Sequence, residues 1–203
     1  MISFARQKIQ NAAMNGAIFL DRDGTMIQEA NYLKDPDLVK IFAATRTGLK
    51  KLGEAGYKLF VVSNQSGVGR GYFTMADVEK VNARLCAELA RDGIRIEKIY
   101  IAPEKPEEPS RGRKPSPQFL FDARDEFGVD LAKSFMIGDK LIDLECGWNA
   151  GVKKSILVRT GYGVETEREA AGKMGRAAAV DDLDQAAQWI LDNFFSGKRR
   201  TEE

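Results

Sequence analysis

Short, mostly apolar runs of four to seven residues alternate along this chain with longer amphipathic stretches. Runs of this kind are typical of strands that are buried on both faces of a sheet. The predicted strands span 17–20, 57–63, 98–102, 134–137 and 155–158, with a further short strand at 177–180. Apolar residues at helical spacing predict helices over 43–55, 74–90, 116–128, 141–150 and 183–194. Because strands and helices alternate, we expect an α/β fold, a Rossmann-like parallel sheet with helices on both faces.

Two long segments lack a regular period. The segment 24–42 predicts an irregular loop or a small hairpin over the end of the first strand. The segment 103–117 contains five of the six prolines, so it predicts an exposed loop. With 203 residues, the chain is long enough for one well-buried domain. We expect that domain over 16–195, between an N-terminal extension, 1–15, and a C-terminal tail, 196–203.

Two other patterns favour a structural interpretation. The glycines of Gly67-Val-Gly69-Arg-Gly71 follow a strand, but no helix is expected to begin at the third glycine. They therefore predict a flexible loop rather than a nucleotide-binding turn. Cys86 and Cys146 lie far apart in the sequence, with no second cysteine near either of them. This spacing favours small buried apolar residues over a disulfide or a metal site.

The charge balance limits the classes of partner. With 31 basic and 30 acidic residues the net charge is +1, so we expect neither nucleic acid nor a membrane surface as a partner. No apolar run approaches the roughly 18 residues of a membrane span, and the first 15 residues lack the apolar core of a secretion signal. We therefore expect a cytoplasmic location. The absence of histidine excludes imidazole-based zinc sites and histidine bases, which leaves acid-base chemistry to carboxylates or lysine.

Polar residues that could take part in catalysis lie where the predicted strands end. Asp21 and Asp23 follow the first strand, Ser63 ends the second, and Asp139 follows the fourth. In a parallel sheet with helices on both faces, ligands bind outside the carboxyl ends of the strands. Lys114 lies in the proline-rich loop, from which it could reach the same edge. The sequence therefore predicts an active site in which Asp21 attacks a phosphate.

A carboxylate can attack a phosphoryl group only if the repulsion between the two anions is removed. Asp21 and Asp139 could jointly hold a hard divalent cation through oxygen, and in a chain without histidine Mg²⁺ fits best. Asp143 follows Asp139 by one helical turn, so it could ligate through water or hydrogen-bond the ligands. We therefore expect a Mg²⁺ site.

The other polar residues have different expected roles. Lys114 would offer a positive charge to the phosphoryl oxygens, and Ser63 would offer a neutral donor. Asp23 is suited to be the general acid for the leaving oxygen and then the base for water. Its pKa, about 3.9 when free, would have to rise, and nearby anions would raise it.

Each of these motifs also has a purely structural interpretation. Asp-x-Asp-Gly is often a turn, and Ser63-Asn64-Gln65 could be a turn at a strand end. Arg113-Lys114 could be a solvated pair in a charged loop, and Gly138-Asp139 could be a helix cap. Four such motifs in this order, each at a strand end or in a flanking loop, favour a common site.

These motifs resemble those of the haloacid dehalogenase superfamily of aspartate-nucleophile phosphatases, over about residues 17–160. Within it, the chain is most similar to the family of heptose bisphosphate and histidinol-phosphate phosphatases. The similar stretches are Phe19-Leu-Asp-Arg-Asp-Gly-Thr25, Ser63-Asn-Gln-Ser-Gly-Val68, Arg70-Gly71, Arg113-Lys-Pro115, Gly138-Asp-Lys140 and Val158-Arg-Thr-Gly161. The resemblance implies a minimal cap, Mg²⁺, and hydrolysis of a small sugar phosphate through an aspartyl-phosphate, with a heptose 1,7-bisphosphate as the first candidate.

The resemblance also implies roles for individual residues. The implied catalytic residues are Asp21, Asp23, Ser63 and Lys114, and the implied metal ligands are Asp21, Asp23, Asp139 and Asp143. The implied substrate contacts are Glu29, Asn31, Tyr32, Asn64, Gln65, Ser66, Arg70, Arg113 and Lys140. A phosphorylated sugar is thus the expected partner of a chain that we expect to be a monomer.

The chain departs from this family in the loop before Arg113-Lys114-Pro115. Many members hold that loop with a zinc ion bound by three cysteines and a histidine. The corresponding stretches here, 102–106 and 110–115, read Ala-Pro-Glu-Lys-Pro and Ser-Arg-Gly-Arg-Lys-Pro. Because all four ligands are absent, we predict no zinc, and a loop held by its own stiffness and by local ion pairs. The change leaves the exact sugar open but not the type of reaction.

Three alternatives remain at this level. Histidinol phosphate could be the substrate. A phosphatase acting on nucleic-acid 3′ ends shares these motifs, although the near-zero net charge counts against it. A module that binds phosphorylated ligands without turnover is a third possibility, which the intact Asp21 and Asp23 disfavour.

Overall fold

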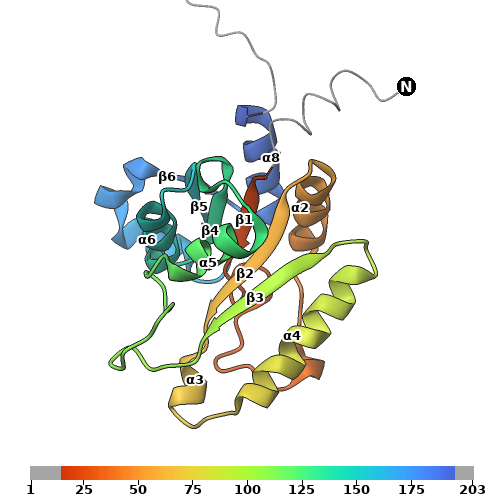
Figure 1. The fold of residues 1–203 in the computed structure, drawn as a ribbon, viewed down its shortest axis with the longest axis vertical. Helices are drawn as coiled ribbons and strands as arrows, with labels where there is room; N and C mark the ends of the chain where they lie inside the picture. Colours follow the sequence, from red (N-terminus) through yellow and green to blue (C-terminus); the bar gives the residue numbers. More distant parts are fainter. Residues whose placement is uncertain (1–14, 195–203) are drawn as a thin grey trace, which may run out of the picture.

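A computed structural model describes residues 15–194, and the expected extension and tail fall outside this range apart from Asn15. Its centre is one six-stranded parallel sheet (Figure 1). The strands are β1 (Ala17–Leu20), β2 (Lys58–Asn64), β3 (Ile96–Ala102), β4 (Phe135–Gly138), β5 (Lys154–Val158) and β6 (Ala177–Val180). Their order is β3-β2-β1-β4-β5-β6, which confirms the predicted parallel sheet.

Helices connect successive strands, and a final helix follows the last strand. They are α2 (Ala43–Glu54), α3 (Ser66–Gly69), α4 (Met75–Ala90), α5 (Gln118–Phe127), α6 (Leu141–Ala150), α7 (Gly163–Glu169) and α8 (Leu183–Phe194). Three 3₁₀ turns, η1 (Pro36–Leu38), η2 (Leu131–Lys133) and η3 (Ala171–Arg176), complete the described elements. No helix within residues 15–194 is long and apolar enough to cross a membrane.

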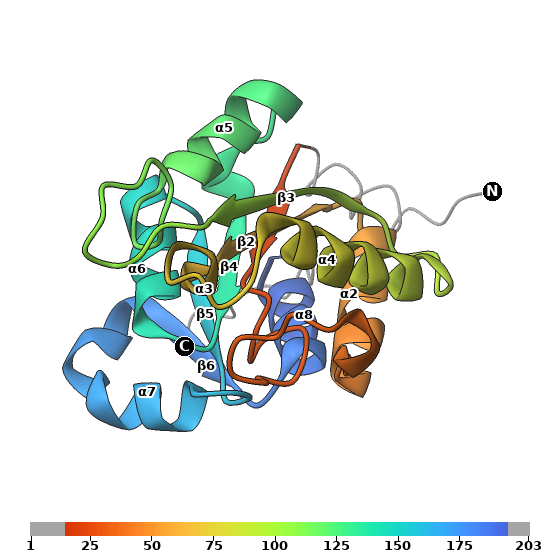
Figure 2. The same ribbon diagram turned by 90° about the horizontal axis from the view of Figure 1, so that it is seen from below.

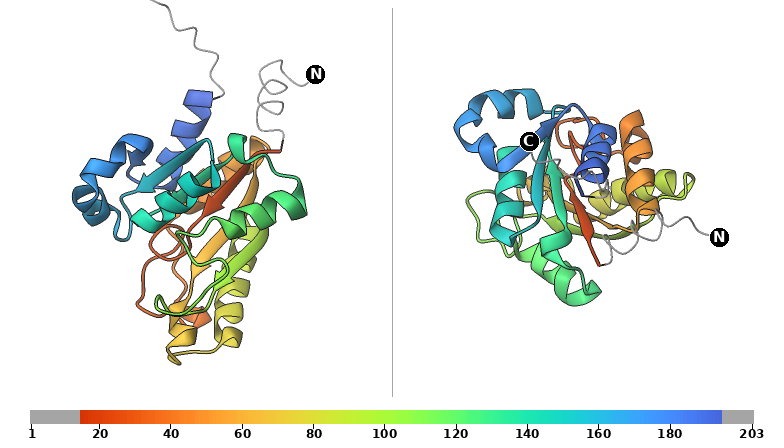
Figure 3. Two further views of the ribbon diagram at one scale, coloured as in Figure 1. Left: turned by 60° about the vertical axis from the view of Figure 1, so that its left-hand side comes forward. Right: turned by 90° about the horizontal axis from the view of Figure 1, so that it is seen from above.

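The four inner strands, β2, β1, β4 and β5, bury side chains on both faces because successive residues point in opposite directions. In β1, Ile18 and Leu20 join a core formed with α2, α4 and α8, whereas Ala17 and Phe19 join a second core formed with α5 and α6. Figure 2 and Figure 3 show the sheet between these two groups of helices. The predicted covering of both faces is therefore confirmed, and it explains why β1 has no polar side chain.

The helix ends follow local sequence signals. The side chain of Thr74 accepts a hydrogen bond from the Asp77 amide, and Asp77 accepts one from the Thr74 amide, as the capping-box spacing predicts. Gly128 and Gly151 end α5 and α6 in the left-handed conformation, which a residue without Cβ adopts at low cost. These caps set where each helix begins or ends relative to the edge of the sheet.

Two local expectations need correction. The glycine-rich segment after β2 is not a flexible loop, because residues 66–69 form the short helix α3. It is ordered by packing, since a side chain at Gly67 would clash with the rings of Phe73 and Tyr32. Helix α7 and turn η3 were not expected at all. The segment 24–42 is mostly irregular, as predicted, with one antiparallel bridge between Ile27 and Ile41.

Candidate active site

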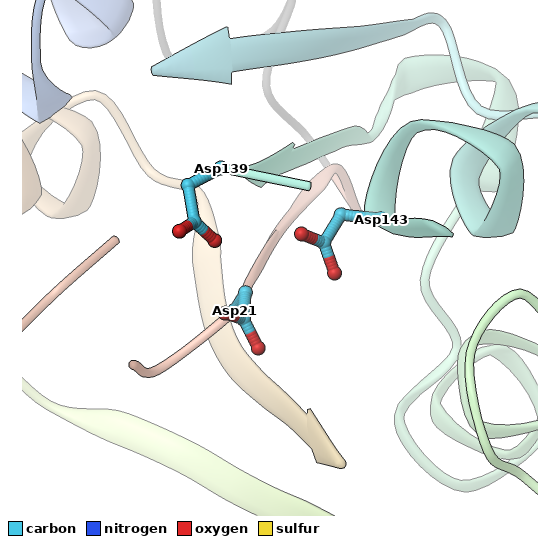
Figure 4. A group of neighbouring side chains, drawn as sticks. All are labelled: Asp21, Asp139 and Asp143. Carbon is cyan, nitrogen blue, oxygen red and sulfur yellow. The ribbon is translucent and has the colours of Figure 1, made fainter. Parts of the chain in front are cut away.

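The carboxyl ends of β1 and β4 bring two aspartates together. The strands pair in register, with Leu20 opposite Ile137, so Asp21 and Asp139 leave the sheet side by side. Asp143 reaches the same point from the first turn of α6. One oxygen of each carboxylate lies within 4.8 Å of the others, and all three residues are buried (Figure 4). The predicted meeting of these aspartates is thus observed.

Asp139 is oriented by the main chain and still has one oxygen to offer. Its Oδ2 accepts a hydrogen bond of 2.9 Å from the Tyr162 amide. Its Oδ1 is buried and has no hydrogen-bond partner among residues 15–194. A buried, unpartnered carboxylate oxygen costs free energy unless a cation or donor binds it. This oxygen therefore fits a metal ligand.

Two glycines make room for the Asp139 carboxylate. Gly24 has φ +81° and Gly161 has φ +55°, a region that favours glycine. A Cβ atom at either position would come within 2.2 or 2.3 Å of Asp139 Oδ2. The main chain can approach the carboxylate this closely only without these side chains.

Lys114 supplies the positive charge at the centre of the group. Its Nζ lies 2.7 Å from Asp143 Oδ1 and also contacts Asp21. Its main chain is held from both sides by Asn64, whose Oδ1 accepts from the Lys114 amide at 3.0 Å and whose Nδ2 donates to the Lys114 carbonyl at 3.2 Å. Asn64, which is also a predicted substrate contact, thus holds the lysine through its side-chain amide.

Asp21 and Asp139 hold protons more tightly than an ordinary aspartate. Burial, followed by repulsion from neighbouring carboxylates, raises the pKa of Asp21 to about 8, although Lys114 opposes the shift. Burial and the charge of Asp143 raise the pKa of Asp139 to about 6. For Lys114, burial lowers the pKa, but Asp143 and Asp21 more than offset it, so its pKa is raised. One lysine cannot balance three buried carboxylates, and a divalent cation fits this donor set.

The side chain of Asp23 lies apart from this carboxylate group. Its two oxygens accept from the Nε and Nη2 atoms of Arg22, and Oδ2 also accepts from Gln65 Nε2 at 2.8 Å. Gln65 donates to Ser63 Oγ at the same distance. Because Ser63 accepts this bond, its own hydroxyl hydrogen remains available for a phosphoryl oxygen.

A pocket of roughly 250 Å³ opens beside these residues. Of the predicted substrate contacts, its walls include Glu29, Asn31, Tyr32, Asn64, Gln65, Ser66 and Lys140. Arg70 and Arg113 are not among the lining residues. Sequence reasoning missed the apolar part of the wall, Leu33, Phe73, Ile142 and Tyr162, because these residues resemble ordinary core positions.

The proline-rich loop is held by polar contacts. Ser110 donates to a carboxylate oxygen of Glu104 at 2.6 Å and accepts from the Arg113 amide at 3.2 Å. The guanidinium of Arg113 donates to the Glu104 carbonyl at 3.0 Å. An ion pair of 3.5 Å joins Lys105 to Glu108, as expected for a loop held by local ion pairs.

Two family models match this chain. The HAD-hydrolase-like model matches residues 112–186, and the model described as polynucleotide kinase 3 phosphatase matches residues 17–144. The chain is 39% identical over 184 residues to the D-glycero-beta-D-manno-heptose-1,7-bisphosphate 7-phosphatase of Salmonella typhi, which covers 87% of this chain and 90% of that protein. It is 38% identical to the protein of the same name from Escherichia coli K12, over 87% of this chain and 88% of that protein.

Solved structures agree with these similarities. The D,D-heptose 1,7-bisphosphate phosphatase of B. bronchiseptica, complexed with magnesium and phosphate, superposes with a TM-score of 0.78 at 29% identity, over 87% of this chain and 98% of that one. The enzyme of the same name from Burkholderia thailandensis gives a TM-score of 0.67 at 28% identity, over 88% and 99%.

Mg²⁺ should stabilise the protein more at high pH than at low pH. The folded, metal-free protein holds protons on Asp21 and Asp139 that the unfolded chain has lost, so raising the pH from about 4 to about 8 weakens this part of its stability. Mg²⁺ competes with those protons, and at 100 times its dissociation constant it adds about 2.7 kcal/mol. Melting temperatures with Mg²⁺ or chelator, at about pH 5 and about pH 8, measure the effect. An equal increment at both pH values, or one that survives Asp139→Asn, contradicts the site.

Gly161→Ala should weaken Mg²⁺ binding. The new Cβ would displace the Asp139 carboxylate. Metal affinity typically falls roughly 10- to 100-fold when the residues that orient a metal ligand are changed. Titration calorimetry with Mg²⁺ measures the change. Gly172→Ala is the matched control, since a Cβ there meets nothing within 4 Å and its affinity should equal that of the wild type.

Proposed function

Since this chain belongs to the haloacid dehalogenase-like hydrolases, in the family of D-glycero-beta-D-manno-heptose-1,7-bisphosphate 7-phosphatases, we propose that it removes the 7-phosphate from a heptose 1,7-bisphosphate. It is thus a phosphoric monoester hydrolase, as the sequence predicts. The observation that carries the proposal is the contact of Lys114 with Asp21, at the wall of a small polar pocket. A neutralised carboxylate facing a pocket of this size is suited to attack a bound phosphate.

The first half of the reaction forms a covalent intermediate on Asp21. An oxygen of its carboxylate attacks phosphorus, and the bond from phosphorus to the sugar oxygen breaks with its electron pair on that oxygen. Asp23 donates a proton to the leaving oxygen, so the sugar departs as an alcohol. Lys114 and Ser63 stabilise the charge that develops on the phosphoryl oxygens.

The second half restores the enzyme. Asp23, now a carboxylate, takes a proton from water as the water oxygen attacks phosphorus. The bond between phosphorus and Asp21 breaks, inorganic phosphate leaves, and Asp21 is again a carboxylate. Asp23 thereby regains the proton that it gave away, and each turnover consumes one ester and one water.

Asp21, Asp139 and Asp143 are the side chains that would hold Mg²⁺. When bound there, the cation neutralises charge between the Asp21 carboxylate and the phosphoryl oxygens, so that the two anions can approach. Because the Asp23 side chain lies outside the carboxylate group, we assign it to proton transfer rather than to metal binding.

The outer part of the pocket would recognise the sugar. Glu29 and Asn31 offer acceptors and donors for hydroxyl groups. Lys140 also lines the pocket, and its Nζ lies 3.7 Å from Glu29 Oε2. Burial lowers the pKa of Lys140, but the surrounding carboxylates more than offset this effect, so its pKa is raised and its charge is kept. Burial and, to a smaller extent, the charge of Arg70 lower the pKa of the Arg113 guanidinium. Although neither arginine is among the lining residues, we propose that Arg113, with Arg70, binds the second phosphate.

The match to the polynucleotide kinase 3 phosphatase model makes nucleic-acid 3′ ends a second candidate substrate class. Because that match spans the strand ends that carry the catalytic residues, it supports phosphate hydrolysis but does not identify the substrate. The net charge of +1 counts against a nucleic-acid substrate, because proteins that bind a phosphate backbone usually carry a basic excess. Histidinol phosphate and binding without turnover are the remaining alternatives, and the same assay separates all four.

Phosphate release from a panel of substrates tests the proposal. With Mg²⁺ we expect the highest kcat/KM for heptose 1,7-bisphosphate, ahead of histidinol phosphate, hexose phosphates and a 3′-phosphorylated oligonucleotide. Asp21→Asn should release no phosphate, because an amide is not a nucleophile. Asp125→Asn, at an exposed residue paired with Arg124, is the matched control and should be as active as the wild type. Absence of wild-type turnover on every substrate would overturn the proposal.

Arg113→Ala should lower kcat/KM for bisphosphates much more than for monophosphates. Loss of one charge-assisted contact corresponds to about 1.5–3 kcal/mol, or roughly 10- to 150-fold in kcat/KM for the bisphosphate. Hexose monophosphates should lose less than about threefold, because they have no second phosphate to bind at Arg113. Arg111→Ala, which removes a guanidinium paired with Asp122 in the same loop, is the control. An equal loss on both substrate types contradicts the assignment of Arg113.

A further inference from the structure

A buried arginine lies between the two aspartates of the first motif. Arg22 is 1% exposed, although its neighbour Asp23 has a side chain that is 18% exposed and lines the pocket. The Nε and Nη2 atoms of Arg22 reach both oxygens of Asp23, at 2.9 to 3.3 Å. Its remaining nitrogen, Nη1, donates at 2.8 Å to Oδ1 of Asn82, which does not line the pocket.

Asn82 is a polar residue on the apolar face of a helix. It is 7% exposed on α4, among the buried side chains of Val78, Val81 and Leu85. A buried amide in such surroundings costs free energy unless it is hydrogen-bonded. Its oxygen is used by Arg22, which lies 60 residues away in the sequence. The amide therefore joins α4 to the loop that carries both aspartates.

We propose that Arg22 and Asn82 are positioning residues for the carboxylate that exchanges protons with substrate and water. The inference rests on the proposed phosphatase activity and on the role of Asp23 in it. A planar guanidinium bonded to both oxygens fixes the rotation of the carboxylate. The bond to Asn82 fixes the guanidinium in turn, so Asp23 and Arg22 cannot rotate away together.

The geometry leaves one direction open for Asp23. Arg22 approaches its carboxylate from the protein interior, and Gln65 donates to Oδ2. The exposed part of the side chain faces the pocket, where the leaving oxygen would lie. Proton transfer depends steeply on such alignment, because donor and acceptor must come within hydrogen-bond distance. Asn82 thus affects the reaction without touching the substrate.

The leaving group distinguishes this role from a structural one. A phenolate leaving from phenyl phosphate needs a proton, whereas a dinitrophenolate leaves without one. A misplaced Asp23 should therefore slow the first substrate selectively, and a general loss of folding or of metal binding should slow both. Both are aryl phosphates, and each variant is compared with the wild type on the same substrate, so differences in binding between the two substrates cancel.

The test uses Asn82→Leu in the full chain with Mg²⁺. For phenyl phosphate we expect kcat to fall roughly 10- to 100-fold with little change in KM, within the range that general acid–base catalysis contributes. The pre-steady-state burst of dinitrophenolate should change less than about threefold. Asn82→Asp keeps an acceptor for Arg22 and should restore most of the lost rate. Arg84→Met, on the same helix but in a surface ion pair with Glu88, should leave both substrates unaffected.

Arg22→Lys provides a second route if Asn82→Leu does not fold. It keeps the charge but cannot bond both oxygens of Asp23 in one plane, so the same selective loss is expected. An equal loss on both substrates, or no loss on either, overturns the inference while the proposed activity stands. Failure of the proposed activity is a separate outcome, because it requires that the wild type release phosphate from no substrate of the panel, and the inference then fails with it.

Discussion

Three carboxylates gathered in a buried space are the constraint on which the rest of the site depends. Their mutual repulsion and their loss of hydration both oppose folding. They are held together because β1 and β4 are neighbours in the sheet and because α6 begins directly after β4. Lys114 offsets part of the charge, and its main chain is fixed by Asn64. The same arrangement that is costly without a cation makes a tight site for one.

The two aspartates of the first motif occupy different electrostatic surroundings although only one residue separates them. Asp21 faces Lys114 and two other carboxylates, and its pKa is raised mainly by burial. Asp23 faces Arg22 and Gln65 and lies outside the carboxylate group. A nucleophile and a proton carrier need such separate surroundings, because the cation that activates the first would hinder protonation of the second.

Much of this could be predicted from sequence where the signal is local. Apolar runs predicted the strands, and strand ends predicted that Asp21 and Asp139 would meet, because a parallel sheet brings those ends to one edge. The partnership of Arg22 with Asn82 could not be predicted, since it depends on how α4 crosses the sheet. Helix α3 was missed for a similar reason. Its formation depends on the packing of Phe73 and Tyr32 against Gly67 rather than on the helix propensity of glycine.

In the proline-rich loop, two adjacent residues have different proposed roles: Lys114 in catalysis and Arg113 in substrate recognition. Lys114 is fixed from the sheet side, by Asn64 and by two carboxylates, whereas Arg113 is fixed from the loop side, by Glu104 and Ser110. Substitutions near Glu104 can therefore move Arg113 without moving Lys114. The outer loop can change with the substrate while the attack on phosphorus is preserved, which fits a chain that keeps the family's catalytic motif and departs from it in this loop.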